Sequence, residues 1–418
     1  MSDMSLSEEL AWRGFVNQTT FKDIKSLDGE PITFYWGVDP SASSMTIGNL
    51  AAAMMVRHFI DYGHKAVLLV GGATGMVGDP DGKSQERNLM SIDDIQNNKA
   101  AIAKQYQQVF GGQNFTLVDN YDWFKDMGYL QFLRELGKHV PMRQMLARDF
   151  VQNRLKEGGA GISYAEFSYV LIQAYDFLYM NREMGVTLQL CGSDQWGNSI
   201  AGVDLIRRLT GSEAHVWSSP LVINKATGAK FGKSEEGAIW LDPDLTSVYK
   251  FYQFWLNVDD EGANDYIKIY TLLSNAEIEQ ILADFKKNPQ ERLAQKTLAY
   301  EVTKLVHGEE AVKSVQRITA VLFSGAPLDT ITSNDVSQLK SELPTVQGAS
   351  GDSLRDVIVA AGLATSASEA KRLIEQGGIY LNNNKVDLSA VLSAQDRQVA
   401  GSALLRRGKN VFALVDIV

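Results

Sequence analysis

The chain has 418 residues, of which 45% are hydrophobic and 22% charged, an ordinary globular mixture that can bury a sizeable core across two to four domains. The single cysteine, Cys191, excludes an intramolecular disulfide and a cysteine-based metal cluster, and a formal net charge of −10 argues against a surface devoted entirely to nucleic acid. No run approaches the ~20 apolar residues of a membrane span, and the acidic first ten residues resemble no presequence, so we expect a cytoplasmic protein.

The first 225 residues alternate apolar strand-like runs with helical stretches, which is typical of an α/β fold with a parallel sheet. The pattern predicts strands over 33–38, 66–72, 115–118 and 187–192, and helices over 48–62, 100–110 and 164–180. Strand, crossover helix and strand in this order imply right-handed units that bind ligands at the carboxyl ends of the strands.

The strand signal fades after about residue 247, and helical periodicity over 249–256, 263–273, 275–286 and 290–306 indicates a helical domain. A polar stretch with two prolines follows, and we interpret it as a linker. The tail has a helix over 354–361, a second helix after a capping box at 366–369, and hairpins over 379–386 and 404–415. The predicted segments are a catalytic domain at 1–225, a connector at 226–247, a helical domain at 248–326, a linker at 327–350 and a separate module at 351–418.

The tail also differs from the body in charge. Its eight Lys and Arg exceed its seven Asp and Glu by one, whereas the rest of the chain has eleven more acidic than basic residues. Lys371, Arg372, Arg406, Arg407 and Lys409 could form one basic face toward RNA phosphates. The alternative is a docking module with scattered charge.

A hydroxyl-rich turn, containing Ser41 and Thr46, joins the strand ending at Val38 to the helix that begins near Gly48. Helix N-termini carry unpaired N–H groups and partial positive charge, which suits a phosphate, and Gly48 would let a nucleotide lie against the backbone. By itself the segment fits an ordinary capped helix better.

Two loops carry cations that could close on a polyphosphate. Lys230 and Lys233 flank Phe231 and Gly232, and could neutralise charge on a leaving pyrophosphate. Lys83 and Arg87 follow a strand end and could form a mobile clamp. A solvated basic loop is the alternative in both cases.

The helix over 163–180 is apolar nearly all round, but Tyr169, Gln173 and Asp176 lie on one face at i, i+4 and i+7. Because a helix of this kind is buried, the polar stripe must find partners inside the protein or in a ligand. The sequence therefore predicts either a structural hydrogen-bond network or a pocket for a small polar molecule.

A second strand end carries Gly192, Asp194 and Gln195 in a turn before another helix. Asp in this position commonly holds ribose hydroxyls in nucleotide-binding α/β proteins. Capping of the following helix by Asp194 is the competing interpretation.

Together these segments resemble a known family. Residues 35–50 resemble the first signature of class I aminoacyl-tRNA synthetases, HIGH, and 230–234 resemble the second, KMSKS. Residues 166–176, 192–198 and 240–255 are similar to tyrosyl-tRNA synthetases of the bacterial type, whose RNA-binding module the tail also resembles. The motifs occur in order over essentially the whole chain.

The resemblance implies a Rossmann-like catalytic domain, an α-helical domain on the anticodon side and a small α+β RNA-binding domain, in a homodimer. Tyrosine and ATP, with Mg²⁺ carried by ATP, would form tyrosyl-adenylate, and tRNA(Tyr) would then accept the tyrosyl group. The resemblance implies neither a prosthetic group nor a protein-bound metal. Catalysis would rest on positioning and on stabilising phosphate charge.

Residue by residue, the resemblance assigns the substrate's phenol to Tyr35 and Asp176, and its ammonium group to Asp79, Tyr169 and Gln173. Gln195 would lie near the reacting carboxylate, with the ATP ribose at Gly192 and Asp194. The phosphates and the helix start would involve Ser41, Thr46, Gly48, Asn49, Lys83, Arg87, Lys230 and Lys233.

The chain departs from the family at three positions. Thr46 and Asn49 stand where the first signature carries histidines, and Trp36 replaces a small residue beside the ATP ribose. Asn49 can still donate to phosphate or cap the helix, and we hypothesise that the Thr46 hydroxyl replaces a histidine donor.

Three other functions fit parts of the sequence. A tryptophanyl-tRNA synthetase shares the catalytic architecture but lacks the tail and has no use for Tyr35 with Asp176. A small-molecule adenylyltransferase needs neither the helical nor the RNA-binding domain. A non-catalytic RNA-binding paralogue fits the missing histidines but not the retained Lys230 and Lys233.

Overall fold

The computed structural model describes residues 4–80, 89–225, 228, 231–234 and 237–418. These residues form two compact units, Met1–Ser247 with Gln253–Val306, and Val248–Tyr252 with His307–Val418. Across the described ranges no helix combines the length and the apolar character that crossing a bilayer requires.

The first unit is built on a six-stranded sheet in the order β1-β6-β5-β2-β3-β4. All neighbouring strands are parallel except β1 and β6, which are antiparallel. The strands are β1 (Gln18–Thr19), β2 (Thr33–Val38), β3 (Lys65–Val70), β4 (Phe115–Asp119), β5 (Leu188–Gly192) and β6 (His215–Ser219). The predicted parallel α/β sheet is confirmed.

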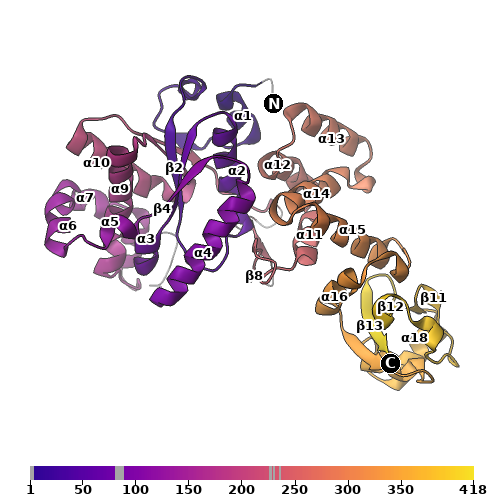
Figure 1. Cartoon of the computed structure of the whole chain (residues 1–418). Helices are drawn as coiled ribbons and strands as arrows, with labels where there is room; N and C mark the ends of the chain where they lie inside the picture. The colour runs from indigo at the N-terminus through magenta and orange to yellow at the C-terminus, as the bar shows by residue number, and fades with distance from the viewer. Residues whose placement is uncertain (1–3, 81–88, 226–227, 229–230, 235–236) are drawn as a thin grey trace. The chain divides into compact units, whose positions relative to one another are not determined.

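Helices cover both faces of this sheet (Figure 1). The helices in this part of the chain are α1 (Leu6–Arg13), α2 (Ile47–Asp61), α3 (Gly72–Val77), α4 (Ile92–Val109), α5 (Tyr121–Phe124), α6 (Tyr129–Glu135), α7 (Met142–Leu146), α8 (Asp149–Leu155), α9 (Tyr164–Met184) and α10 (Trp196–Thr210). Side chains of β2 alternate between the faces, as the pleat requires. Phe34 packs on Phe59 of α2, and Tyr35 packs on Phe177 of α9.

Trp36 lies on the same face of β2 as Phe34 and is a core residue. Its ring packs against Tyr106 and Phe110 of the α4 region, with ring centroids 5.5 and 6.3 Å away, and only 4% of the residue is exposed. The departure at this position therefore has a structural explanation, because a large ring fills the space between the sheet and α4.

The predicted helical region is folded as helices, but it is not one compact body. The helices are α11 (Val248–Leu256), α12 (Asp260–Tyr270), α13 (Asn275–Lys287), α14 (Leu293–His307) and α15 (Glu309–Phe323). Residues up to Val306 belong to the first unit, except 248–252, and α15 belongs to the second. Arg13 of α1 explains part of this division, because its guanidinium donates to the carbonyls of Lys268, Thr271 and Leu273 around the end of α12.

The second unit contains a five-stranded sheet in the order β11-β10-β12-β13-β9. The strands are β9 (Thr345–Gly348), β10 (Ile379–Leu381), β11 (Asn384–Lys385), β12 (Ser402–Arg407) and β13 (Val411–Ile417), and α17 (Leu354–Ala360) and α18 (Ala367–Glu375) pack on one face. Both predicted hairpins are present. Ser366 caps α18 as expected, but Glu369 returns to the N–H of Thr365 rather than to that of Ser366.

The predicted linker at 327–350 is instead folded. It contains α16 (Ser333–Glu342) and β9, which pairs in parallel with β13. Leu328, Val336 and Leu339 are buried against α15 and the far face of the sheet. Two prolines and many polar residues suggested a linker, but a capping box from Thr332 to Asp335 starts a helix between them.

Asp335 holds α16 to α15. It is fully buried and accepts hydrogen bonds from Ser314, from the backbone of Thr332 and, at 2.8 and 3.0 Å, from Arg317. Burial opposes ionisation, but these donors outweigh it and lower the pKa of Asp335 to about 2. The ionised carboxylate therefore stabilises the folded state above a pH of about 4, and this contribution is lost as the pH falls through 2.

We predict that Asp335→Asn lowers the free energy of unfolding of the second unit by about 2–3 kcal/mol at pH 7, because a buried pair loses its anion while Arg317 can return to solvent. Denaturant unfolding at pH 7 and at acid pH checks this, since the difference should shrink below a pH of about 4. Asp329→Asn, at an exposed position just before α16, is the matched control. Equal stability of wild type and Asp335→Asn at pH 7 would contradict the prediction.

Candidate active site

The predicted polar stripe of α9 faces the carboxyl ends of the central strands in the first unit. Tyr169 and Asp176 are buried, and Gln173 is partly buried between them. Tyr35 of β2 lies on the same side of the sheet and packs against α9 through Phe177. The structure therefore brings four of the predicted substrate-binding residues together.

Asp176 is held from both sides. Asn120 donates to one carboxylate oxygen at 3.1 Å, and the indole N–H of Trp123 donates to the other at 2.9 Å. Burial raises the pKa of Asp176 well above its usual range, although these donors favour the charged form. The carboxyl group is thus fixed in position in a poorly solvated place.

Three buried oxygen atoms near this stripe have no hydrogen-bond partner within the described residues: the Tyr35 hydroxyl and the side-chain carbonyls of Gln173 and Gln189. Gln189 of β5 is directly paired in register with Tyr35. Burial, and then the charge of Asp176, raise the pKa of Tyr35 well above 10, so its hydroxyl stays protonated and can donate. Buried polar groups are rarely left unpaired, so these atoms mark a place for a polar ligand.

The opposite end of the stripe is acidic. The Tyr169 hydroxyl donates to Asp39 at 2.7 Å. Burial, followed by the charges of Asp39, Asp79 and Asp176, raises the pKa of Tyr169 well above 10. Several carboxylates close to one buried hydroxyl favour a cation at this end of the site.

Gln195 connects the acidic end of the α9 stripe with the carboxyl end of β5. Its amide nitrogen donates to Asp79 at 2.5 Å. Asp194 is exposed in a short 3₁₀ helix, η3 (Ser193–Gln195), and Gln195, not Asp194, is the N-cap of α10. Capping therefore does not account for Asp194. A Cβ at Gly192 would lie 2.6 Å from the Asp194 carboxylate, so a larger residue there would displace the Asp194 side chain.

Thr46 is the N-cap of α2 and forms a capping box with Asn49. The Thr46 hydroxyl and N–H both lie 2.9 Å from the Asn49 side-chain oxygen, and the Asn49 N–H returns to the hydroxyl. The capping alternative for Thr46 is therefore present in the structure. In the described part of the chain, the Asn49 side-chain NH₂ and the Gly48 N–H have no protein acceptor.

The second signature segment lies against this helix start. Ile47 donates its N–H to Ile239, which in turn donates to the carbonyl of Gly232. Gly232 has φ of +91°, and a Cβ there would lie 2.6 Å from the Ile47 side chain. Only glycine permits this approach. The two signatures, nearly 200 residues apart in sequence, are thus joined by backbone hydrogen bonds.

Several predicted phosphate-binding residues cannot be placed. Lys83, Arg87 and Lys230 lie outside the described residues. The backbone of Lys233 is in strand β7 (Lys233–Ser234), which pairs with β8 (Gly237–Ala238). Ser41 is exposed in the turn after β2.

The basic residues of the second unit do not share one face. Arg406 and Arg407 are neighbours on β12, so their side chains point to opposite sides of the sheet. Arg406 lies over the ring of Tyr380, 4.1 Å from its centroid, whereas Arg407 contacts Glu369 at 3.4 Å beside α18. Lys371 and Arg372 are exposed on α18, and Lys409 is exposed in the turn between β12 and β13. The prediction of a single basic face is therefore wrong. Arg406 lies on one side of the sheet, and Arg407 lies on the other side with α18.

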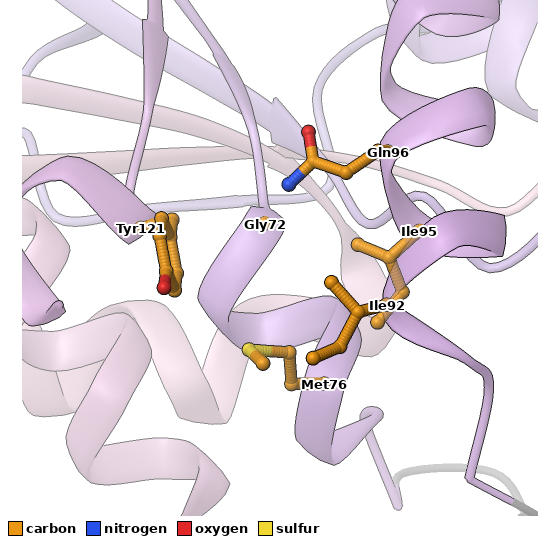
Figure 2. A pocket seen from close by; sticks show the side chains of 6 residues that line it. All are labelled: Gly72, Met76, Ile92, Ile95, Gln96 and Tyr121. Atoms are coloured by element: carbon orange, nitrogen blue, oxygen red, sulfur yellow. The ribbon is translucent and has the colours of Figure 1, made fainter.

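A cavity of about 60 Å³ lies between α3, α4 and α5 (Figure 2). The side chains of Met76, Ile92 and Ile95 line it, with the ring of Tyr121 opposite them. None of its lining residues is a predicted site residue. The polar stripe is the better candidate for a site, because it gathers the titratable groups and the unpaired oxygens.

The sequence interpretation missed four residues that shape the site: Asp39, Asn120, Trp123 and Gln189. Only Gln189 had a usable signal, since a lone amide in the apolar strand 187–192 must find a buried partner. Asp39 directly follows β2, where a carboxylate could have been expected. Asn120 and Trp123 come from a loop and a short helix that no periodicity predicted.

Comparison with known proteins places this geometry in a family. Residues 27–324 match the family model of class I tRNA synthetases (W and Y), and residues 335–415 match the C-terminal domain of tyrosine–tRNA ligases. The chain is 42% identical to the tyrosine–tRNA ligases of Bacillus caldotenax and Roseiflexus castenholzii, over 99% of this chain and 99% and 100% of theirs. A C-terminally truncated mitochondrial tyrosyl-tRNA synthetase of Aspergillus nidulans superposes with a TM-score of 0.68 and 30% identity, covering 76% of this chain and 94% of that one.

The unpaired Tyr35 hydroxyl generates a stability prediction. Tyr35→Phe removes a buried hydroxyl that has no partner in the described structure, so we expect the ligand-free protein to gain about 1 kcal/mol in free energy of unfolding. Tyr270→Phe is the matched control, because that fully buried hydroxyl donates to the Ile47 carbonyl at 3.1 Å, and its loss should cost about 1 kcal/mol. Denaturant unfolding of both variants checks the prediction, and equal destabilisation by both would contradict it.

Proposed function

The chain belongs to the tyrosine–tRNA ligases of the class I tRNA synthetases, and from this premise we propose how its residues bind the substrates and support the two reaction steps. In the first step a carboxylate oxygen of tyrosine bonds to the α-phosphorus of ATP, and pyrophosphate leaves. In the second a ribose hydroxyl of the terminal adenosine of tRNA(Tyr) attacks the tyrosyl carbonyl, and AMP leaves. Mg²⁺ enters with ATP.

The phenol of the substrate binds between Tyr35 and Asp176. The observation that supports this most is the unpaired Tyr35 hydroxyl beside a carboxyl group fixed by Asn120 and Trp123. A substrate hydroxyl can donate to Asp176 and accept from Tyr35, so it satisfies both groups. Phenylalanine would leave the Tyr35 hydroxyl unpaired and would withhold a further donor from Asp176 in a buried site, which is costly.

The ammonium group of the substrate binds at the acidic end of the stripe. Tyr169, Gln173 and Asp79 hold it, and Asp39 adds charge through its hydrogen bond with Tyr169. The Gln173 carbonyl, unpaired in the described structure, gains a donor from the ammonium group. Gln195, which donates a hydrogen bond to Asp79, then lies beside the reacting carboxylate of the substrate tyrosine.

The ATP phosphates bind at the start of α2. Gly48 and Asn49 provide an N–H and an NH₂ group that have no acceptor among the described residues, at the positive end of the helix dipole. The Thr46 hydroxyl already donates to Asn49, so Thr46 acts by orienting Asn49. Ser41, Lys83, Arg87, Lys230 and Lys233 complete the phosphate site, and Gly192 with Asp194 holds the ribose. Charge stabilisation and positioning replace acid–base catalysis.

The second unit binds tRNA, with Lys371 and Arg372 on one side of its sheet and Arg406 on the other. The stack of Arg406 on Tyr380 provides a flat surface of the kind on which nucleobases pack. Arg407 is paired with Glu369, so it contributes less free charge than its neighbours.

A second copy of the chain covers the exposed apolar surface formed by α6–α8 and the start of α9. Its members are Tyr129, Leu130, Met142, Leu146, Leu155 and Tyr164. Leu130 is 79% exposed, and the hydroxyls of Tyr129 and Tyr164 lie 3.4 Å apart. Apolar surface of this kind is typical of subunit interfaces. We therefore expect a homodimer. We also propose that the protein is cytoplasmic, as expected from the sequence.

The alternatives are less well supported. A tryptophanyl enzyme shares the family model, but full-length relatives and the C-terminal domain model are those of tyrosine–tRNA ligases. A non-catalytic paralogue has no need for the unpaired oxygens beside Asp176.

We predict that purified full-length protein exchanges pyrophosphate into ATP with tyrosine, and at least about 30-fold less well with phenylalanine. The ratio follows from leaving the Tyr35 hydroxyl unpaired and withholding a donor from Asp176, at about 1–3 kcal/mol each and therefore at least about 2 kcal/mol together. Tryptophan, which carries no phenol, serves as the control for the alternative enzyme. Comparable exchange with tyrosine and phenylalanine would contradict phenol recognition, and exchange with tryptophan alone would favour the tryptophanyl enzyme.

We predict that Lys371→Glu with Arg372→Glu lowers tRNA charging at least about tenfold at moderate salt and leaves tyrosine-dependent exchange unchanged. Two cations that face RNA phosphates in this proposal are reversed, and they belong to the unit that contains none of the proposed tyrosine- and ATP-binding residues. The loss should be larger when both proteins are compared at lower salt with subsaturating tRNA, because the phosphate contacts of the wild type strengthen more than those of the variant as salt falls. Asp387→Asn, at an exposed acidic position of the same unit, is the control. Unchanged charging by the double variant would refute an RNA role for α18.

A further inference from the structure

A continuous chain of side-chain hydrogen bonds leads into the site from the loop between α7 and α8. Arg148, in that loop, donates from one guanidinium nitrogen to the Asn198 oxygen and from the other to the Gly197 carbonyl at 2.5 Å. The Asn198 nitrogen donates to the Gln195 oxygen at 3.0 Å. The Gln195 nitrogen donates to Asp79 at 2.5 Å. Asn198 is only 3% exposed.

The two ends of this chain determine the orientation of the amides between them. A guanidinium group can only donate, so Asn198 must present its oxygen to Arg148 and its NH₂ to Gln195. An ionised carboxylate can only accept, so Gln195 must present its NH₂ to Asp79. The donors and acceptors run head to tail from a cation to an anion, an arrangement in which each bond polarises the next.

We propose that Arg148 and Asn198 are positioning residues for tyrosine recognition, which set the orientation of Gln195 and thereby hold Asp79 toward the substrate ammonium group. A Gln195 amide turned the other way would place its oxygen against the Asp79 carboxylate. Two acceptors repel, so Asp79 would move from its place and tyrosine would bind less tightly. This inference rests on the proposed function, in which Asp79 and Gln195 contact tyrosine.

Stabilisation of α10 does not explain the position of Arg148. Arg148 lies at the first turn of α10, over Gly197, where a Cβ would be 3.6–4.0 Å from three guanidinium atoms. A cation at a helix N-terminus opposes the helix dipole. The position is explained instead by the need for an obligate donor at this end of the hydrogen-bond chain.

Asn198→Asp in the full-length protein separates the two roles. The aspartate still accepts from Arg148 as an ion pair, so folding is maintained, but it cannot donate to Gln195. We expect the Kd for tyrosine, measured by equilibrium binding, to rise about tenfold, the effect of one hydrogen bond to a charged group. The KM for ATP and the Tm should stay near the wild-type values.

Two further variants test the logic of the donor. Arg148→Lys keeps an obligate donor and should bind tyrosine within about threefold of wild type, whereas Arg148→Met should resemble Asn198→Asp. Arg207→Met, at an exposed arginine of α10 paired only on the surface with Asp204, is the matched control and should not differ from wild type.

The results distinguish this inference from the proposed function. Wild-type tyrosine affinity in Asn198→Asp would overturn the positioning role, and so would a parallel rise in the KM for ATP with a fall in Tm. Failure of Arg148→Lys to restore affinity would overturn the donor argument. Absence of tyrosine binding by the wild type would instead refute the proposed function.

Discussion

The site depends on the burial of polar side chains between α9 and the central strands. Tyr35, Tyr169 and Asp176 are almost wholly excluded from water, and buried polar groups must be paired. The protein pairs Asp176 with Asn120 and Trp123, and Tyr169 with Asp39, whereas the Tyr35 hydroxyl and two glutamine carbonyls have no partner among the described residues. Selectivity follows, because a ligand that lacks the matching groups enters a site with unmet hydrogen bonds.

At the proposed phosphate end of the site, backbone geometry does most of the positioning. Capping by Thr46 fixes the start of α2, and hydrogen bonds through Ile239 bring Gly232 against Ile47. Tyr270, from the helical region of the same unit, donates to the Ile47 carbonyl and packs near Phe231 of the second signature. Thr46 and Asn49, which stand in place of the signature histidines, thus form a capping box at the start of α2. In the described structure the Asn49 NH₂ group has no acceptor within the protein.

Much of the fold could be predicted from the sequence, because strands such as 33–38 and 115–118 are short apolar runs and α9 has a strong helical pattern. The prediction of a linker at 327–350 is wrong. Two prolines and a polar composition indicate a linker, but a capping signal between the prolines starts a helix. Tertiary contacts that bury Leu328 and Leu339 then hold this segment in the folded unit. In the candidate site, Tyr35 and Asp176 were predicted from the motif and the helix face, and the structure places both on the same side of the sheet. Asn120, Trp123 and Arg148 were missed, because side chains from irregular segments reach the site only through the tertiary fold.

The central claim is that the substrate's hydroxyl satisfies the Tyr35 hydroxyl and Asp176. The most direct test is calorimetric binding of tyrosine and phenylalanine, without ATP, to the wild type and to Tyr35→Phe. The account predicts that the wild type prefers tyrosine strongly, and that the preference falls at least about tenfold in Tyr35→Phe, because one of the two partners of the phenol is gone. An unchanged preference in Tyr35→Phe would contradict it.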